Sequence, residues 1–131
     1  MGIVNYILDT HTFLWWIGDD ERLSKQVFDI VADKNNKIYF SAVSAWEISI
    51  KIRIGKLTVA EDPDKFLTDN INENGFLVMP INLIHSTKIF HIPNTHRNPF
   101  DQMLAAQSLS EKMPLLSEDS KIAELGAELI W

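Results

Sequence analysis

Four acidic side chains in this sequence end predicted strands or open predicted helices. Asp9 and Asp119 follow short apolar runs, and Glu47 and Asp101 lie in the first turns of predicted helices. In a parallel α/β sheet, strand ends and helix starts share one edge, so these acids are expected to be neighbours in space. Gathered carboxylates repel one another unless a cation lies among them, and Mg²⁺ prefers such oxygen ligands. The chemistry that this pattern predicts is metal-assisted hydrolysis of a phosphodiester.

Helix capping is a simpler explanation for each of these acids taken alone, because acids stabilise helix N-termini. Ser44 and Glu47 have the spacing of a capping box, and Asn98 with Asp101 forms a weaker version. Asp119 can cap the last predicted helix. Capping is the commoner role of any single acid, whereas four acids at one sheet edge favour a functional site.

Short apolar strands alternate with helical segments along the chain. Strands are predicted at residues 4–8, 38–40, 76–79, 115–116 and 128–130, and helices at residues 12–18, 24–34, 43–54, 63–74, 83–90, 99–112 and 120–125. This alternation predicts a parallel sheet with helices on both faces. Because no repeat, low-complexity tract or linker interrupts it, residues 1–131 are predicted to form a single domain.

The bulk composition, 46% hydrophobic and 23% charged, is that of a soluble globular protein and excludes membrane and disordered classes. No basic segment precedes the first apolar run, so no signal peptide is expected. The absence of cysteine excludes disulfides and is compatible with a reducing compartment, and the cytoplasm is the expected location. A net charge of −6 argues against a broad basic nucleic-acid surface, but not against an acidic nuclease site that divalent cations neutralise.

Four segments of the chain resemble the motifs of PIN-domain ribonucleases. The three main motifs are YILDTHTFLWW at residues 6–16, SAVSAWEISIK at 41–51 and HRNPFDQMLAAQ at 96–107, and LLSED at 115–119 resembles the fourth. The chain is most similar to VapC-type toxins of bacterial toxin–antitoxin pairs, and the motifs span nearly all of it. The resemblance implies a PIN-like three-layer α/β fold with a five-stranded parallel sheet in the order 3-2-1-4-5. Three residues depart from the usual pattern: Asn98 and Gln102 stand where relatives often carry Asp and Arg, and Ser117 replaces a common Thr.

The same resemblance implies RNA cleavage that depends on Mg²⁺ or Mn²⁺, with metal-binding or catalytic roles for Asp9, Glu47, Asp101 and Asp119. We expect Asp9 and Asp101 to hold the principal metal, and Glu47 to complete its shell or to orient a water as general base. The implied partners are an RNA substrate, a cognate antitoxin and a second copy of the chain. No membrane partner is expected.

Two hydroxyl residues beside the acids are predicted to support them. Thr10 and Ser117 could hold Asp9 and Asp119 in position by hydrogen bonds.

Basic and aromatic residues near the motifs are candidates for RNA contacts. Lys51, Arg53 and Arg97 could bind an RNA backbone, although Lys51 is equally placed to pair with Glu47 at i, i+4. Tryptophans at positions 15, 16 and 46 could stack on RNA bases, but core packing is the stronger expectation for at least two of the three.

Other function classes fit the sequence less well. A haloacid-dehalogenase-type phosphohydrolase needs a second acid two residues after Asp9, where His11 stands, and a receiver domain needs an Asp after the third strand. A catalytically silent PIN-fold module that binds RNA or protein remains the alternative to a nuclease.

Overall fold

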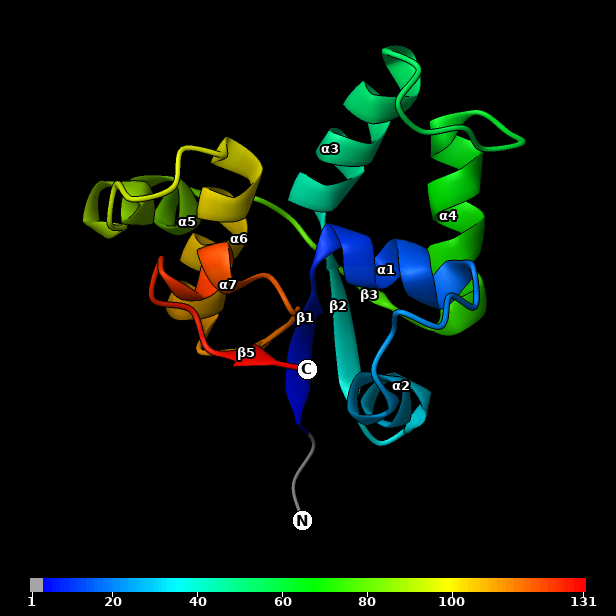
Figure 1. Ribbon diagram of the computed structural model, residues 1–131, viewed down its shortest axis with the longest axis horizontal. Coiled ribbons are helices and arrows are strands. Elements are labelled where there is room, and N and C mark those ends of the chain that lie inside the picture. Colours follow the sequence, from blue (N-terminus) through cyan, green and yellow to red (C-terminus); the bar gives the residue numbers. More distant parts are fainter. Residues whose placement is uncertain (1–3) are drawn as a thin grey trace.

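Five short parallel strands form the central sheet of the computed structural model, which describes residues 4–131 (Figure 1). They are β1 (Asn5–Leu8), β2 (Lys37–Ser41), β3 (Leu77–Met79), β4 (Leu115–Leu116) and β5 (Leu129–Ile130), in the order β3-β2-β1-β4-β5. All four pairings are parallel. The predicted strand order is therefore confirmed, and residues 1–3 of the predicted domain lie outside the described chain.

The first strand lies at the centre of the sheet. It pairs with β2 on one side and with β4 on the other, so that Leu8 stands opposite both Phe40 and Leu116. Ile7 and Leu8 are both completely buried because helices cover the two faces of the sheet. The continuous apolar run before Asp9 is the sequence pattern of such a strand.

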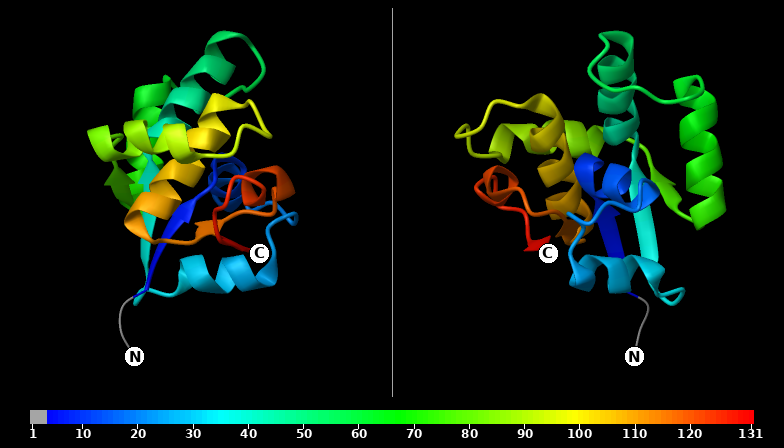
Figure 2. Two further views of the ribbon diagram at one scale, coloured as in Figure 1. Left: turned by 90° about the vertical axis from the view of Figure 1, so that its left-hand side faces the viewer. Right: turned by 45° about the vertical axis from the view of Figure 1, so that its right-hand side comes forward.

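Helices cover both faces of the sheet, which gives the predicted three layers. They are α1 (Thr10–Ile17), α2 (Lys25–Ala32), α3 (Ala42–Arg53), α4 (Pro63–Asn74), α5 (Leu83–Lys88), the 3-10 helix η1 (Ile89–His91), α6 (Pro99–Glu111) and α7 (Ser120–Ala123). Figures 1 and 2 show α5, α6 and α7 on one side of β1 and β2, and α1, α2 and α4 on the other.

Each face of the sheet has its own apolar core, and successive strand residues belong alternately to the two cores. Ile7 and Leu115 pack with Leu104 of α6, whereas Leu8 and Leu116 pack in the opposite core with Phe13 of α1. Helix α3 contributes Val43 to the first core and Ile48 to the second. It therefore stands over the carboxyl edge of the sheet and joins the two layers.

Most predicted element boundaries agree with the structure to within two residues, and two helices differ in kind or length. The helix predicted at residues 83–90 is α5 followed by the 3-10 helix η1, and the one predicted at residues 120–125 ends at Ala123. Within residues 4–131, no helix combines the length and apolar character that a membrane crossing requires.

Candidate active site

Asp9 directly follows β1 and occupies the N-cap position of α1. Among the described residues, its side chain accepts no capping hydrogen bond from the helix. Its Oδ2 instead accepts a hydrogen bond of 2.8 Å from Ser117 Oγ, which follows β4. Capping therefore does not explain this carboxylate, which is only 6% exposed.

Glu47 lies in the second turn of α3, and the predicted capping box with Ser44 is wrong. The N-cap of α3 is Ser41, whose Oγ accepts the Val43 backbone N–H at 3.0 Å, so the helix begins at Ala42. The buried Glu47 carboxylate is held from two sides. Its Oε1 accepts a hydrogen bond of 2.8 Å from Thr10 Oγ1, and its Oε2 lies 2.9 Å from Lys51 Nζ.

Asp101 lies in the first turn of α6, where Asn98 is the N-cap. Asn98 Oδ1 accepts the backbone N–H groups of Phe100 at 2.9 Å and Asp101 at 3.4 Å, which leaves the Asp101 carboxylate free of a capping role. That carboxylate lies 2.6 Å from His96 Nε2. Gln102 Nε2 in turn donates to the His96 carbonyl at 2.7 Å and fixes the loop before the helix. Asn98 and Gln102, two of the three departures from the motif, thus hold the local structure around Asp101.

Asp119 is the N-cap of the short helix α7, as the capping explanation predicted. Its Oδ1 accepts the Lys121 backbone N–H at 3.0 Å. Together with Asp9 and His11 it lines a cavity of about 400 Å³ beside α1, the remaining lining residues being Thr12, Trp15, Arg22, Glu118 and Ser120. Asp119 therefore caps a helix and also faces the same space as Asp9.

Of the two predicted supporting hydroxyls, Ser117 contacts both Asp9 and Asp119, whereas Thr10 contacts Glu47 instead. Ser117 Oγ donates to the Asp9 carboxylate and accepts the backbone N–H of Asp119 at 3.1 Å. The Thr10 hydroxyl bonds to Glu47 and to Ser44 Oγ, 2.8 Å away, rather than to Asp9. Thr10 and Ser44 are both buried, so this contact ties α1 to α3.

The carboxyl groups interact electrostatically. Burial raises the pKa of Asp9 to about 6, repulsion from Asp101 adds to the rise, and the Ser117 hydrogen bond and His11 oppose it. The pKa of Asp101 is also raised, first by burial and then by Asp119 and Glu47, against the hydrogen bond from His96. Asp101 therefore interacts with each of the other three predicted site acids, and this gathering of negative charge favours a cation.

The donor atoms at this edge fit a hard divalent cation, but the side chains do not form a closed coordination shell. Within residues 4–131, no three His, Asp or Glu side chains converge closely enough to hold a metal ion. Each of the four predicted acids has a hydrogen-bonding partner of its own. Carboxylate oxygens with raised pKa values still suit Mg²⁺ or Mn²⁺, since such ions retain several waters and need few protein ligands.

The predicted RNA-contacting residues differ in their surroundings. Lys51 pairs with Glu47, whereas Arg53 and Arg97 are exposed. Trp15 and Trp16 are half-buried, and Trp46 is 52% exposed with its ring 4.9 Å from that of Phe100.

Two residues near the acids were not singled out in the sequence. His96 contacts Asp101, and Arg22 lies over the ring of Trp15 with its guanidinium carbon 4.9 Å from the centroid. The position of His96 two residues before the Asn98 cap was an available clue, whereas the loop that carries Arg22 shows no distinguishing pattern.

Comparison with known proteins agrees with this fold. The family model of the PIN domain matches residues 6–128. Ribonuclease VapC16 of Mycobacterium tuberculosis is 37% identical over 57 residues, which are 44% of this chain and 40% of that protein.

Solved structures extend the similarity over almost the whole chain. VapBC2 from Rickettsia felis, bound to a DNA fragment from its promoter, has a TM-score of 0.72 at 15% identity and covers 97% of this chain and 98% of that one. VapBC-1 from nontypeable Haemophilus influenzae has a TM-score of 0.68 at 14% identity, with 97% of each chain covered. At such low identities these structural similarities show the fold alone. The match to the family model covers nearly all of the sequence. This chain belongs to the PIN domain family.

Proposed function

We propose that this chain is a cytoplasmic endoribonuclease that hydrolyses RNA phosphodiester bonds with Mg²⁺ or Mn²⁺ and acts as the toxin of a toxin–antitoxin pair. The observation that carries this proposal is the set of buried carboxylates at one sheet edge, where burial and repulsion raise the pKa values of Asp9 and Asp101. The partial similarity to a protein named as a ribonuclease supports the same reaction.

Roles for the acids follow from their positions. Asp9 and Asp101 would hold the divalent ion, Glu47 would complete its shell or accept a proton from the attacking water, and Asp119 would act from the cavity that it shares with Asp9. When bound, the ion supplies Lewis-acid stabilisation of the negative charge that develops on the phosphodiester. Ser117, Thr10 and His96 orient the carboxylates of Asp9, Glu47 and Asp101, respectively.

The test is RNA cleavage by wild-type protein and by Asp9→Asn and Asp101→Asn, with Mg²⁺ or Mn²⁺ supplied. We expect wild-type cleavage to require the metal, and each variant to lose at least a hundredfold in rate. Asp29→Asn on α2 is the matched control, because Asp29 is exposed and pairs with Lys25 away from the acids.

Two outcomes would contradict the proposal in different ways. Equal cleavage by wild type and both variants would reject the assignment of the site. Pure wild-type protein that folds but cuts no RNA with either metal would favour the alternative, a catalytically silent PIN-fold module that binds RNA or protein.

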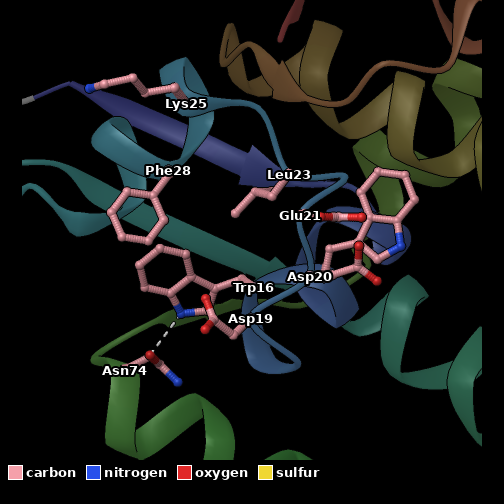
Figure 3. A pocket seen from close by; sticks show the side chains of 9 residues that line it. Trp16, Asp19, Asp20, Glu21, Leu23, Lys25, Phe28 and Asn74 are labelled. Carbon is pink, nitrogen blue, oxygen red and sulfur yellow. Dashed lines mark hydrogen bonds between the residues drawn. The ribbon is translucent and has the colours of Figure 1, made fainter.

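An antitoxin has a suitable docking surface in the cavity of about 690 Å³ between α1, α2 and the end of α4. Figure 3 shows Trp16 and Phe28 side by side in this cavity, with Trp16 Nε1 donating to Asn74 Oδ1 at 2.8 Å. Three acidic residues and one basic residue are among its other lining residues, which are Trp15, Asp19, Asp20, Glu21, Leu23 and Lys25. The cavity therefore fits a peptide segment with apolar anchors and basic residues, and we propose that the antitoxin supplies one.

We also propose that the chain forms a homodimer. Leu83 and Ile84 of α5 are 77% and 68% exposed, and Phe90 of η1 is 89% exposed. Apolar side chains grouped at this level of exposure favour a protein interface. A second copy of the chain would bury them.

A further inference from the structure

Helix α3 presents an aromatic ring and a guanidinium group to solvent. Among residues 42–53, all of which the structure describes, Trp46 and Arg53 are exposed and the others are buried or partly buried. Trp46 and Arg53 stand seven positions apart, which is nearly two full helical turns, so both lie on one face of α3. The two side chains therefore share a strip of surface that runs along this helix.

Trp46 lies next to the acids of the site. It directly precedes Glu47 on α3, and its ring lies 4.9 Å from that of Phe100. Phe100 in turn directly precedes Asp101 on α6. The two rings are inclined at 78°, an edge-to-face contact that covers at most one face of the indole. With 52% of Trp46 exposed, its ring can still receive a planar ligand beside the acids.

The charge of this segment favours an anionic ligand. Residues 42–56 contain one acid, Glu47, and three basic residues, Lys51, Arg53 and Lys56, although the whole chain has a net charge of −6. Glu47 is buried and pairs with Lys51, so the fully exposed charged side chains of the segment, Arg53 and Lys56, are both positive. Exposed aromatic rings beside cations are the features by which proteins hold single-stranded nucleic acids, through base stacking and phosphate contacts.

We propose that Trp46 binds a nucleobase of the RNA substrate by stacking, and that Arg53 contacts the RNA backbone along the same face of α3. Phe100 is a positioning residue that supports the indole ring. The inference rests on the proposed ribonuclease function and adds to it a base-binding subsite beside the acids.

The test compares the binding of two fluorescein-labelled octanucleotides in EDTA, where the proposed metal-dependent cleavage does not proceed. One consists of adenosines, and the other is abasic, with the same ribose-phosphate backbone and no bases. Fluorescence anisotropy should show that wild-type protein binds the adenosine octamer more tightly. Trp46→Ala should bind the adenosine octamer about tenfold more weakly than wild type does, because it loses one stacked base. Its affinity for the abasic octamer should be unchanged.

Three further variants separate stacking from other effects. Trp46→Phe retains an aromatic face and should keep most of the preference for bases, whereas Trp46→Leu should behave as Trp46→Ala does. Arg53→Gln should weaken the binding of both octamers to the same extent, because a phosphate contact does not distinguish them.

Ile54→Ala is the matched control. Ile54 is the C-cap residue of α3 and is 56% exposed, so the substitution removes an equally exposed apolar side chain that has no ring. It should bind both octamers as wild type does. Circular dichroism of each variant verifies that it is folded.

Failure of this inference is distinguishable from failure of the proposed function. Metal-dependent RNA cleavage by wild type, with equal affinity of wild type and folded Trp46→Ala for the adenosine octamer, would overturn the base-binding subsite alone. A Trp46→Ala variant that loses self-association and keeps its RNA affinity would assign this face to a protein contact and would also overturn it. Wild-type protein that prefers the adenosine octamer through Trp46 but cuts no RNA with either metal would support the subsite and reject the nuclease.

Discussion

At the scale of single residues, ionised Asp9 reduces the stability of the protein as long as no cation is bound. The folded pKa of about 6 exceeds the ordinary value of 3.8, so the folded state binds this proton more tightly than the unfolded state does. The stability that the proton provides is present in full below pH 3.8 and is lost as the pH rises through 6. Asp101 acts in the same direction because its pKa is also raised.

Asp9→Asn should therefore stabilise the metal-free protein at neutral pH. The pKa difference corresponds to about 3 kcal/mol at pH 7, and asparagine can still accept the Ser117 hydrogen bond. Urea unfolding in EDTA should show the variant gaining on wild type between pH 4 and pH 7, whereas exposed Asp29→Asn should show no such trend. A variant less stable than wild type at pH 7 would contradict this account of the site.

Two buried threonines of α1 permit a matched comparison. Thr10 donates to Glu47, whereas Thr12 donates to the backbone carbonyl of Leu116 at 2.7 Å. Thr10→Val leaves a buried Glu47 oxygen unpaired and should lose about 1–3 kcal/mol in the free energy of unfolding. Thr12→Val should lose about 1 kcal/mol, because the Leu116 carbonyl still accepts the Asp9 backbone N–H at 3.3 Å. Only Thr10→Val should also lower RNA cleavage at saturating Mg²⁺, by about tenfold. Equal cleavage by the two variants would show that the Thr10 contact is merely structural.

At the scale of secondary-structure elements, α3 shows both the reach and the limit of local sequence patterns. Trp46 and Ile50 at helical spacing predicted the helix, and its end was correctly placed near Gly55. The predicted capping box was wrong, because Ser44 and Glu47 have its spacing but the Ser44 hydroxyl contacts Thr10 of another helix. A local pattern cannot anticipate a partner that lies 34 positions away in the sequence.

For the acids of the site, too, the sequence predicts the location but not the contacts. Their common edge was predictable because every strand is parallel and each acid follows a strand or opens a helix. The hydrogen-bonding partner of each carboxylate was not predictable, since Ser117 and Asp9 stand 108 positions apart. The fold therefore follows from patterns within segments, whereas the hydrogen bonds of the site depend on contacts between segments.

The N-cap residue of α3 should contribute more to the free energy of unfolding than an ordinary N-cap residue does. Ser41 Oγ accepts the Val43 N–H and also donates to buried Gln107 Oε1 at 2.5 Å, whereas Ser24 Oγ only accepts the Val27 N–H of α2. Ser24→Ala should cost about 1 kcal/mol. Ser41→Ala should cost about 2–3 kcal/mol because the Gln107 oxygen is also left unpaired. Equal losses in thermal unfolding would mean that the Gln107 contact adds nothing.

At the scale of the whole molecule, the exposed apolar side chains of α5 and η1 lie apart from the cavity that contains Trp16 and Phe28. The proposed dimer and antitoxin surfaces are therefore separate. Ile84→Glu should convert a dimer to a monomer in light scattering coupled to size-exclusion chromatography. Phe28→Glu, an exposed apolar residue of the other surface, should remain dimeric. Wild-type protein that is monomeric at high concentration would refute the proposed dimer.

The hydrogen bond between Ser117 and Asp9 has a consequence for the newly made chain. Asp9 is synthesised 108 positions before its hydroxyl donor Ser117. β4, which flanks β1 in the finished sheet, is also made after β1. A nascent chain whose residues 115–119 are still inside the ribosome therefore lacks part of the acid site, and ribosomes stalled before these residues should display no RNA cleavage.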